Sequence, residues 1–362
     1  MDVIKIFFTI RCNFRCDYCF VHLDEEIMAP EILDNILTWG IKNNVKRVIL
    51  TGGEPTSSFD LIVRAAKFMK RYTNPDFKFD GIPTNGTQLT RERIYIAKSL
   101  NLKFIFSLDG YAYESNMFRH HNRELHDKII DNLEFYAKVY GKPPKINLTV
   151  PQENAHELHE NVLSLLRRGY TKIHICPEFG RPWGDKYTND FLESFEKLLV
   201  IHRKFKQIFK DLRVDPIDLY CDKIRTKDYE GMTQASCDVG SEVAFSVKGE
   251  AYACLVMLHL QDGHPLRKEY YLGDINKGID LEKMRTFKNY NICSEFPVSR
   301  KFNFPNISCR KVYATVNFHT GERMEAKYIE NLMKIEYTMF QRTYETYFKK
   351  MLVRGEPRLI EV

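Results

Sequence analysis

The chain has 362 residues, a net charge of +6 and 44% hydrophobic residues. This length can bury a large core and form two domains, and the composition is that of a globular protein rather than a disordered one. No apolar run approaches the roughly 20 residues that a membrane helix needs, and residues 1–10 lack the basic start and cleavage site of a signal peptide. We therefore expect a cytoplasmic protein without a membrane partner, and the mild positive charge does not by itself favour nucleic acid.

The first half of the sequence alternates between two kinds of pattern. Short apolar runs predict strands at 3–10, 46–52, 77–84, 103–109, 145–150 and 172–179. Apolar residues at three- and four-residue spacing predict helices at 30–44, 59–72, 91–100, 125–140 and 155–170. Strands alternating with helices form right-handed βαβ units around a parallel sheet. Six units do not close an eight-unit barrel, so we predict an α/β fold with a partial, TIM-like (β/α)6 barrel.

The pattern changes after a long predicted helix at 189–212. Two strand-like runs, EVAFSV and AYACLVML, lie on either side of VKGE (247–250) and predict a β-hairpin. A last helix is predicted at 326–352. These patterns suggest a barrel at 1–212, a small hairpin-containing domain at 213–324 and a C-terminal helix within 325–362.

Unusual residues lie at or just beyond the carboxyl ends of the predicted strands, where parallel α/β folds place their active sites. In chain order they are Cys12, Cys16, Cys19, Gly52, Gly53, Glu54, Asn85, Ser107, Asp109 and Cys176. Glycine and asparagine often end strands for conformational reasons alone. That explanation does not account for three cysteines at the same end.

The nine cysteines do not suit a complete disulfide framework, because their number is odd. A CxxxCxxC loop can bring three thiolates to one face of a cubic iron–sulfur cluster and leave the fourth iron without a protein ligand. Zinc is the alternative, since thiolates also suit it, but a zinc site needs a fourth ligand.

The segment Cys12-x3-Cys16-x2-Cys19 resembles the signature of the radical S-adenosylmethionine (SAM) superfamily. The aromatic residues Tyr18 and Phe20, which stand directly before and after Cys19, are part of this resemblance. The similarity extends through 52–55, 84–87 and 107–110, within the first 180 residues or so. It implies that the three cysteines hold a 4Fe–4S cluster whose open iron binds the methionine part of SAM. It further implies SAM-binding roles for Tyr18, Phe20, Gly52, Gly53, Glu54, Asn85, Ser107, Asp109 and Arg119.

A second resemblance concerns the later cysteines. The stretch from Cys237 to Cys254, with LGDI at 272–275, resembles the start of the SPASM or twitch domains of many radical SAM enzymes. It implies that Cys237, Cys254, Cys293 and Cys309 bind one auxiliary 4Fe–4S cluster. Zinc, or cysteines that are merely buried, are the alternatives.

Two cysteines and one loop remain. Cys176 and Cys221 are candidates for donating a hydrogen atom to a substrate radical, although burial alone also explains each. The loop 178–190 follows the sixth predicted strand, and we expect its Glu178, Arg181, Trp183 and Asp185 to face the substrate.

The resemblance implies an enzyme that cleaves SAM to methionine and a 5′-deoxyadenosyl radical, which then abstracts hydrogen from a peptide or small molecule. Oxidation, cross-linking and epimerisation are the possible outcomes, and peptide maturation is slightly favoured. A flavodoxin or ferredoxin would supply the electron. The alternatives are a non-catalytic iron–sulfur electron-transfer protein and an RNA-modifying radical SAM enzyme.

Overall fold

The computed structural model describes residues 3–72, 77–226, 240–287, 317, 320–322 and 324–348. The chain divides into two compact units. The first comprises 1–108, 116–145 and 238–289, and the second comprises 109–115, 146–237 and 290–362. Within the described ranges, no helix is both long enough and apolar enough to cross a membrane.

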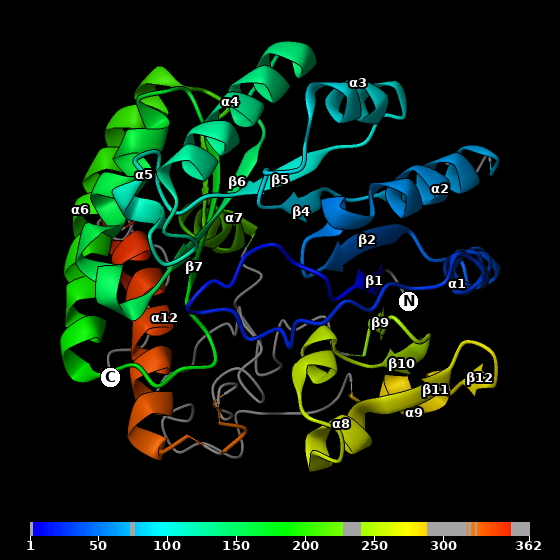
Figure 1. Cartoon of the computed structure of the whole chain (residues 1–362). Helices are drawn as coiled ribbons and strands as arrows, with labels where there is room; N and C mark the ends of the chain where they lie inside the picture. The colour runs from blue at the N-terminus through cyan, green and yellow to red at the C-terminus, as the bar shows by residue number, and fades with distance from the viewer. Residues whose placement is uncertain are drawn as a thin grey trace. The chain divides into compact units, whose positions relative to one another are not determined.

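The first unit is built on a sheet whose strand order is β12-β11-β10-β9-β1-β2-β3. Strand β1 (Val3–Thr9) pairs in parallel with β2 (Arg47–Gly52) on one side and with β9 (Glu242–Phe245) on the other. Figure 1 draws the blue β1 beside the yellow-green β9. Nearly every residue of β1 is buried, as expected for a central strand covered on both faces.

The predicted hairpin is confirmed. Strand β9 pairs antiparallel with β10 (Glu250–Tyr252), and β10 pairs antiparallel with β11 (Tyr271–Asp274). The edge strand of this sheet is β12 (Gly278–Ile279). The hairpin thus extends the sheet that holds the N-terminal strand, while the domain boundaries suggested by the sequence stay a prediction.

A parallel pair, β4 (Ile82–Thr84) and β5 (Phe104–Ser107), completes the strands of the first unit. Its main helices are α1 (Pro30–Lys42), α2 (Phe59–Lys70), α3 (Arg91–Ser99) and α4 (Arg123–Tyr140), with short helices α8 (Pro265–Tyr270) and α9 (Leu281–Thr286). Helix α1 shows why these segments fold: proline stands at its first position, and Leu33, Ile36, Leu37 and Gly40 form one buried face.

The second unit contains the parallel strands β6 (Lys145–Val150), β7 (Lys172–Pro177) and β8 (Arg213–Asp215). Its helices are α5 (Leu158–Leu166), α6 (Asp185–Ile208), α7 (Ile217–Thr226) and α12 (Ala326–Tyr347). Helix α12 packs on α6 and α7. Asp218 of α7 ties them together, because its carboxylate binds His202 (2.9 Å) and Lys206 (2.7 Å) of α6, and His202 also binds Tyr347 of α12 (2.6 Å).

The parallel α/β class is confirmed, and the sequence located most elements to within a few residues. The prediction of a single strand at 77–84 was wrong. The range contains two strands, because β3 (Lys78–Phe79) pairs with β2, whereas β4 pairs with β5. The short elements β8 and α7 were not predicted.

Candidate functional site

The cysteine loop leaves β1 at its carboxyl end and carries Cys12, Cys16 and Cys19, all half-buried and outside any disulfide. The loop is tightly turned. The backbone N–H of Cys19 donates to the carbonyl oxygen of Cys16 (2.9 Å), and that of Phe14 donates to the Sγ of Cys12 (3.3 Å). A sulfur that accepts backbone hydrogen bonds is better suited to carry negative charge.

Burial disfavours thiolates in this loop as long as no metal is bound. It raises the pKa of Cys12 to about 11, although the Phe14 N–H opposes the shift. It also raises the pKa of Cys19, against the positive charges of Arg119 and Arg15. The thiols of Cys12 and Cys19 therefore hold their protons at neutral pH, and metal binding would release these protons.

Gly52 and Gly53 end β2 against the strand that leads into the cysteine loop. Their backbone contacts are close: the N–H of Gly53 donates to the Thr9 carbonyl oxygen (2.9 Å), and the next N–H, of Glu54, donates to that of Arg11 (2.8 Å). A Cβ at Gly52 would lie 2.4 Å from the Thr9 oxygen, and one at Gly53 would lie 2.6 Å from the Arg11 oxygen. Only glycine allows this approach, so the pair supports the base of the cysteine loop.

Glu54 is fully buried, and its carboxylate is occupied by the protein itself. Oε1 accepts hydrogen bonds from the backbone N–H (2.9 Å) and hydroxyl (2.5 Å) of Thr56 and from the hydroxyl of Thr84 (2.7 Å). Oε2 accepts one from the backbone N–H of Asn85 (2.6 Å). Burial nevertheless raises its pKa. The side chain therefore clamps the end of β2 to the end of β4.

Asn85 joins this clamp to the cysteine loop through a residue that the sequence reasoning missed. The Asn85 amide donates to Oδ1 of Asn13 (2.9 Å), and the Asn13 amide donates to the hydroxyl of Thr87 (3.0 Å). The Thr87 hydroxyl donates back to Oδ1 of Asn85 (2.7 Å), which closes a three-residue ring that we call the amide brace. Asn13 directly follows Cys12, and that position was the only signal that could have revealed it.

Arg119 lies beside the cysteine loop, as the prediction for it requires. Its guanidinium carbon is 5.4 Å from the ring centroid of Tyr18, and the residue is buried. The neighbouring carbonyl oxygen of Phe118 accepts a hydrogen bond from the backbone N–H of Asp17 (2.9 Å). The segment therefore packs on the loop, with its positive charge near Cys19.

Two further candidates lie at the end of β5 and just beyond it. Ser107 is the last residue of the strand, and its half-buried hydroxyl has no hydrogen-bond partner among the described residues. Asp109 belongs to the second unit, where its buried carboxylate accepts a hydrogen bond from the backbone N–H of Thr149 (2.9 Å). Ser107 is thus free to contact a ligand, while Asp109 secures strand β6.

The two candidate hydrogen donors of the second unit differ in position. Cys176 is half-buried near the carboxyl end of β7, whereas Cys221 is buried on α7. Burial raises the pKa of each to about 12. Both therefore keep the S–H bond that a hydrogen-atom donor needs.

The loop after β7 is organised by internal contacts. The guanidinium of Arg181 binds both oxygens of Glu153 (2.9 Å each) and both oxygens of Glu178. Trp183 is fully buried, and its indole N–H donates to the carbonyl oxygen of Glu178 (2.9 Å). Asp185 pairs with Lys327 of α12 (2.9 Å). The expectation that Trp183 faces a substrate does not agree with this burial.

Of the four cysteines assigned to an auxiliary cluster, only Cys254 lies within the described residues, where it is buried immediately before the short 3-10 helix η4 (Leu255–His259). Cys237, Cys293 and Cys309 lie outside them.

The donor set at the cysteine loop fits an iron–sulfur cluster by its chemistry, because three soft thiols share one short, half-buried loop that supplies an N–H···S bond. Within the described ranges, however, no three His, Cys, Asp or Glu side chains already lie at metal-ligating spacing. The thiols would therefore turn toward one another as they bind the cluster.

The cysteine loop lies in a segment that resembles a known family. Residues 6–165 match the model of the Radical SAM superfamily. This segment is therefore similar to radical SAM domains, as the cysteine motif predicts.

Two proteins with similar sequences illustrate the range of relatives. An uncharacterised protein of Methanocaldococcus jannaschii is 27% identical over 60% of this chain and 77% of its own length. A GTP 3′,8-cyclase of Staphylococcus aureus is 25% identical over 70% of this chain and 78% of its own length.

Among solved structures, anSMEcpe with bound AdoMet is similar with a TM-score of 0.73 and 15% identity, over 98% of this chain and 99% of the other. The same protein with AdoMet and the Cp18Cys peptide has a TM-score of 0.70 and 16% identity, over 97% and 98%. This likeness confirms the predicted fold, an α/β partial barrel.

Proposed function

We propose that this protein cleaves SAM reductively and uses the resulting radical to abstract hydrogen from a peptide. A reduced 4Fe–4S cluster, when bound, supplies the electron that splits SAM into methionine and a 5′-deoxyadenosyl radical. The observation that carries the proposal is the loop of three half-buried cysteines at the end of β1, held by the glycine pair and the amide brace.

The chain's own residues would bind and orient the cofactors. Cys12, Cys16 and Cys19 would hold the cluster. Arg119 would bind the SAM carboxylate, since a guanidinium matches a carboxylate in shape and charge. Its position over Tyr18 supports that role. Phe20, Ser107 and the backbone of 52–54 would complete the SAM site, and the packed loop would exclude water from the radical.

Glu54 and Asn85 would act through the backbone rather than on SAM itself. Each is already engaged by neighbouring residues, so each would fix the shape of the SAM site. Asp109 would do the same for the strand that follows it.

One observation supports a peptide as the substrate: a similar structure contains a bound peptide together with AdoMet. The fate of the substrate radical depends on the thiols. Cys176 keeps its proton near the end of β7, where it would return a hydrogen atom to a substrate radical in an epimerisation. If no thiol donates, a fully ligated auxiliary cluster at Cys237, Cys254, Cys293 and Cys309 would accept the electron, and the product would be oxidised or cross-linked. A flavodoxin or ferredoxin would reduce the enzyme.

To test the proposal, the iron–sulfur clusters are reconstituted in the protein without oxygen, and dithionite is then added as the reductant together with SAM. We expect 5′-deoxyadenosine to form, with roughly four irons for one cubane cluster and roughly eight for two. A Cys12→Ala variant should lose the product and about half of the iron, while a Cys176→Ala variant should keep both. No 5′-deoxyadenosine from a fully loaded protein would refute the proposal and favour a non-catalytic electron-transfer protein.

Deuterium separates the possible fates of the substrate. Epimerisation in deuterated water places deuterium at the product carbon, and Cys176→Ala or Cys221→Ala should abolish this uptake if that thiol is the donor. Oxidation or cross-linking gives a product that is two mass units lighter and carries no deuterium.

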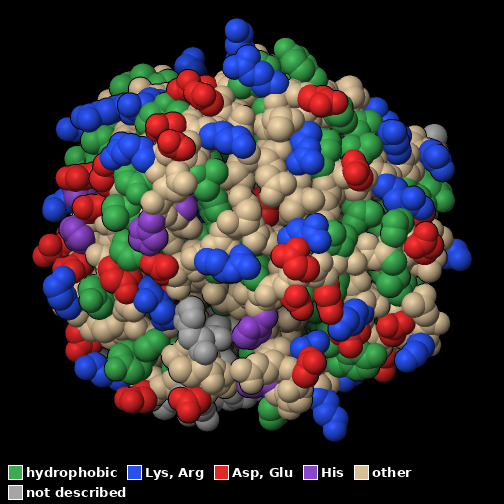
Figure 2. All heavy atoms as spheres, viewed as in Figure 1, with side chains coloured by type: hydrophobic (Ala, Val, Ile, Leu, Met, Phe, Trp, Pro, Cys, Tyr) green, Lys and Arg blue, Asp and Glu red, His purple; other side chains and the backbone are tan. Residues whose placement is uncertain are grey.

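A small molecule is the second candidate substrate, and the similarity to a GTP 3′,8-cyclase favours a nucleotide. Incubation with GTP, SAM and dithionite tests it, because GTP consumption in step with 5′-deoxyadenosine formation would replace the peptide proposal. An RNA substrate is less favoured. On the face drawn in Figure 2, basic and acidic side chains are interspersed rather than gathered into one basic region, and RNA binding would require a steep salt dependence.

A further inference from the structure

One side chain of the cysteine loop has no part in the site described above. Arg15 stands directly before Cys16, and it is exposed. Its guanidinium is nevertheless folded back onto the loop, because Nη1 donates to the carbonyl oxygens of Cys12 and Phe14 at 2.8 Å each. The backbone therefore holds a positive charge against the segment that carries the three cysteines.

This charge acts on the thiols at both ends of the loop. Burial raises the pKa of Cys12 and of Cys19, and the positive charge of Arg15 opposes the rise at each of them. Both anchors of the guanidinium are backbone oxygens, so the cysteine side chains can turn toward a metal without releasing it. Arg15 would therefore stay beside the sulfurs when a cluster is bound.

Arg15 has no carboxylate partner among the described residues, which distinguishes it from other basic residues of this region. Arg11, at the start of the loop, pairs with Glu25 (2.6 Å). Lys248, in the turn between β9 and β10, pairs with Glu26 (3.3 Å). A carboxylate next to a cation cancels most of its field at a distance. The charge of Arg15 is not cancelled in this way.

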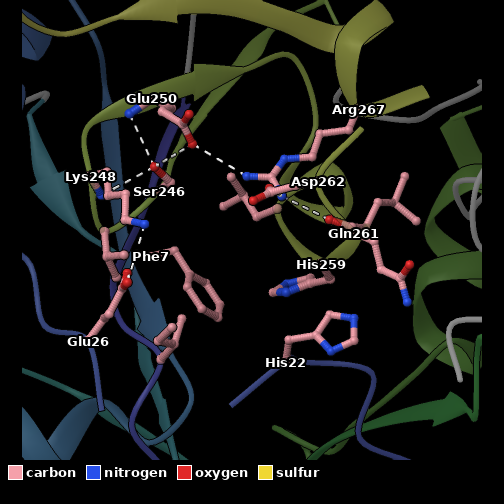
Figure 3. Close-up of a pocket in the computed structure, with 14 residues that line it drawn as sticks. Phe7, His22, Glu26, Ser246, Lys248, Glu250, His259, Gln261, Asp262 and Arg267 are labelled. Carbon is pink, nitrogen blue, oxygen red and sulfur yellow. Dashed lines mark hydrogen bonds and ion pairs between the residues drawn. The ribbon is translucent and has the colours of Figure 1, made fainter. Parts of the chain in front are cut away.

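The wall of a cavity beside β1 is balanced in the same manner. The cavity has a volume of about 500 Å³, and Figure 3 shows the charged side chains that line it. Arg267 contacts the carboxylates of both Glu250 (3.5 Å) and Asp262. Burial lowers the pKa of His259 to about 3, so this ring is neutral. These wall residues therefore add no net positive charge to the region around the cysteine loop.

A cation beside an iron–sulfur cluster changes how readily the cluster accepts an electron. The reduced cluster carries one more negative charge than the oxidised cluster, so a nearby positive charge stabilises the reduced form more. The net charge and the exposure of the surroundings are among the factors that set the reduction potential. Since Arg15 is exposed, water and salt weaken its influence without removing it.

We propose that Arg15 raises the midpoint potential of the cluster at the cysteine loop and thereby makes this cluster easier for an electron donor to reduce. Arg15 acts through space on the cluster and makes no contact with SAM or substrate. This inference rests on the cluster of the proposed function, but its test is made without SAM and does not depend on SAM cleavage.

A redox titration of the anaerobically reconstituted protein, followed by EPR in the absence of SAM, tests the proposal. The EPR signal that is missing in Cys12→Ala identifies the cluster in question. Arg15→Gln removes the charge but keeps an amide that can donate to the loop. Its equilibrium constant for reduction should fall about two- to fivefold, as expected for an exposed charge pair. This corresponds to a potential lower by about 20–40 mV, at 59 mV for each factor of ten.

Two further measurements separate the charge of Arg15 from its hydrogen bonds. Arg15→Lys keeps the charge and should retain the potential of the unmodified protein. Raising the salt concentration should reduce the difference between Arg15→Gln and the unmodified protein, because salt screens exposed charges.

Arg93→Gln is the matched control. Nη1 of Arg93 also donates to two backbone carbonyl oxygens, those of Thr56 (2.9 Å) and Gln88 (3.0 Å). Its charge is not among those that act on the thiols of Cys12 and Cys19. Arg93→Gln should therefore leave the potential unchanged. The melting temperature and iron content show that each variant is folded and loaded.

Three results would overturn the proposal. The first is an equal potential for Arg15→Gln and the unmodified protein. The second is a shift in Arg15→Lys as large as that in Arg15→Gln, which would assign the effect to the hydrogen bonds rather than to the charge. The third is an Arg15→Gln protein that binds no iron at the loop, because Arg15 would then be needed for assembly. A shifted potential without formation of 5′-deoxyadenosine would instead refute the proposed function and leave this inference intact.

Discussion

Replacing Glu54 by Gln tests whether the buried carboxylate holds the site together. Each carboxylate oxygen accepts a hydrogen bond from one backbone N–H group. The N–H of Thr56 donates to Oε1, and the N–H of Asn85 donates to Oε2. Glutamine keeps only one oxygen. The hydroxyls of Thr56 and Thr84 can rotate so that they accept hydrogen bonds from the new amide NH₂ group. A backbone N–H can only donate, so the N–H of either Thr56 or Asn85 must face the NH₂ group and lose its hydrogen bond.

The loss of stability can be estimated from this one broken hydrogen bond. A buried donor left unsatisfied costs about 1–3 kcal/mol, and the loss of charge weakens the remaining bonds. Removing a charge that burial disfavours, as the raised pKa of Glu54 indicates, offsets part of this. We expect a net loss of about 2–3 kcal/mol, which for a chain of 362 residues corresponds to roughly 3–4 °C in melting temperature by calorimetry.

The exposed Glu92 of α3 provides the matched control, since Glu92→Gln should change stability by less than about 0.5 kcal/mol. A Glu54→Gln protein as stable as the unmodified one, or more stable, would refute the reasoning. It would mean that the desolvation of the carboxylate outweighs its four hydrogen bonds.

Three further predictions concern Gly52, Asn13 and His259. Gly52→Ala should lower the iron bound at the cysteine loop and the melting temperature, because its Cβ meets a backbone oxygen at 2.4 Å, whereas Gly184→Ala, whose nearest neighbour is at 3.7 Å, should do neither. Asn13→Ala should shift the midpoint potential of the cluster, measured by redox titration with EPR detection, and unchanged EPR signals and potential would contradict a role for the amide brace. His259 is neutral when folded and takes up a proton below pH 6.5 only when unfolded, so stability should fall as pH drops, by about 2 kcal/mol between pH 6.5 and 5. Chemical denaturation at both pH values measures this loss, and an equal loss in His259→Phe would assign it to other groups.

The sequence predicted the elements that depend on local pattern. Strand β1 was evident because five of its seven residues are apolar, and α1 because its apolar positions recur along one face. The division at 80–81 was not evident, since it depends on which neighbour each half meets. Gly81 lies where a Cβ would be 2.6 Å from the side chain of Ile105.

The candidate site was predicted in its residues more than in its contacts. The motif placed Glu54 at the right strand end, but only the structure shows its carboxylate turned inward to Thr56, Thr84 and Asn85. Trp183 was misjudged for a similar reason. A tryptophan in a loop at a strand end can be a contact residue or a core residue, and its direction depends on tertiary packing against Phe191 of α6.

The parallel pairing of β1 with β9 has a consequence for how the protein is made. Residues 3–6 find one of their two partners only in residues 242–245. At a synthesis rate of about 5–20 residues per second, that partner leaves the ribosome about 10–50 s after β1 does. During this interval one edge of β1 is open to other chains, next to three thiols that have not yet received metal. Chaperone protection of nascent β1, and iron loading only after residue 245 has been made, would therefore favour a high yield of active protein.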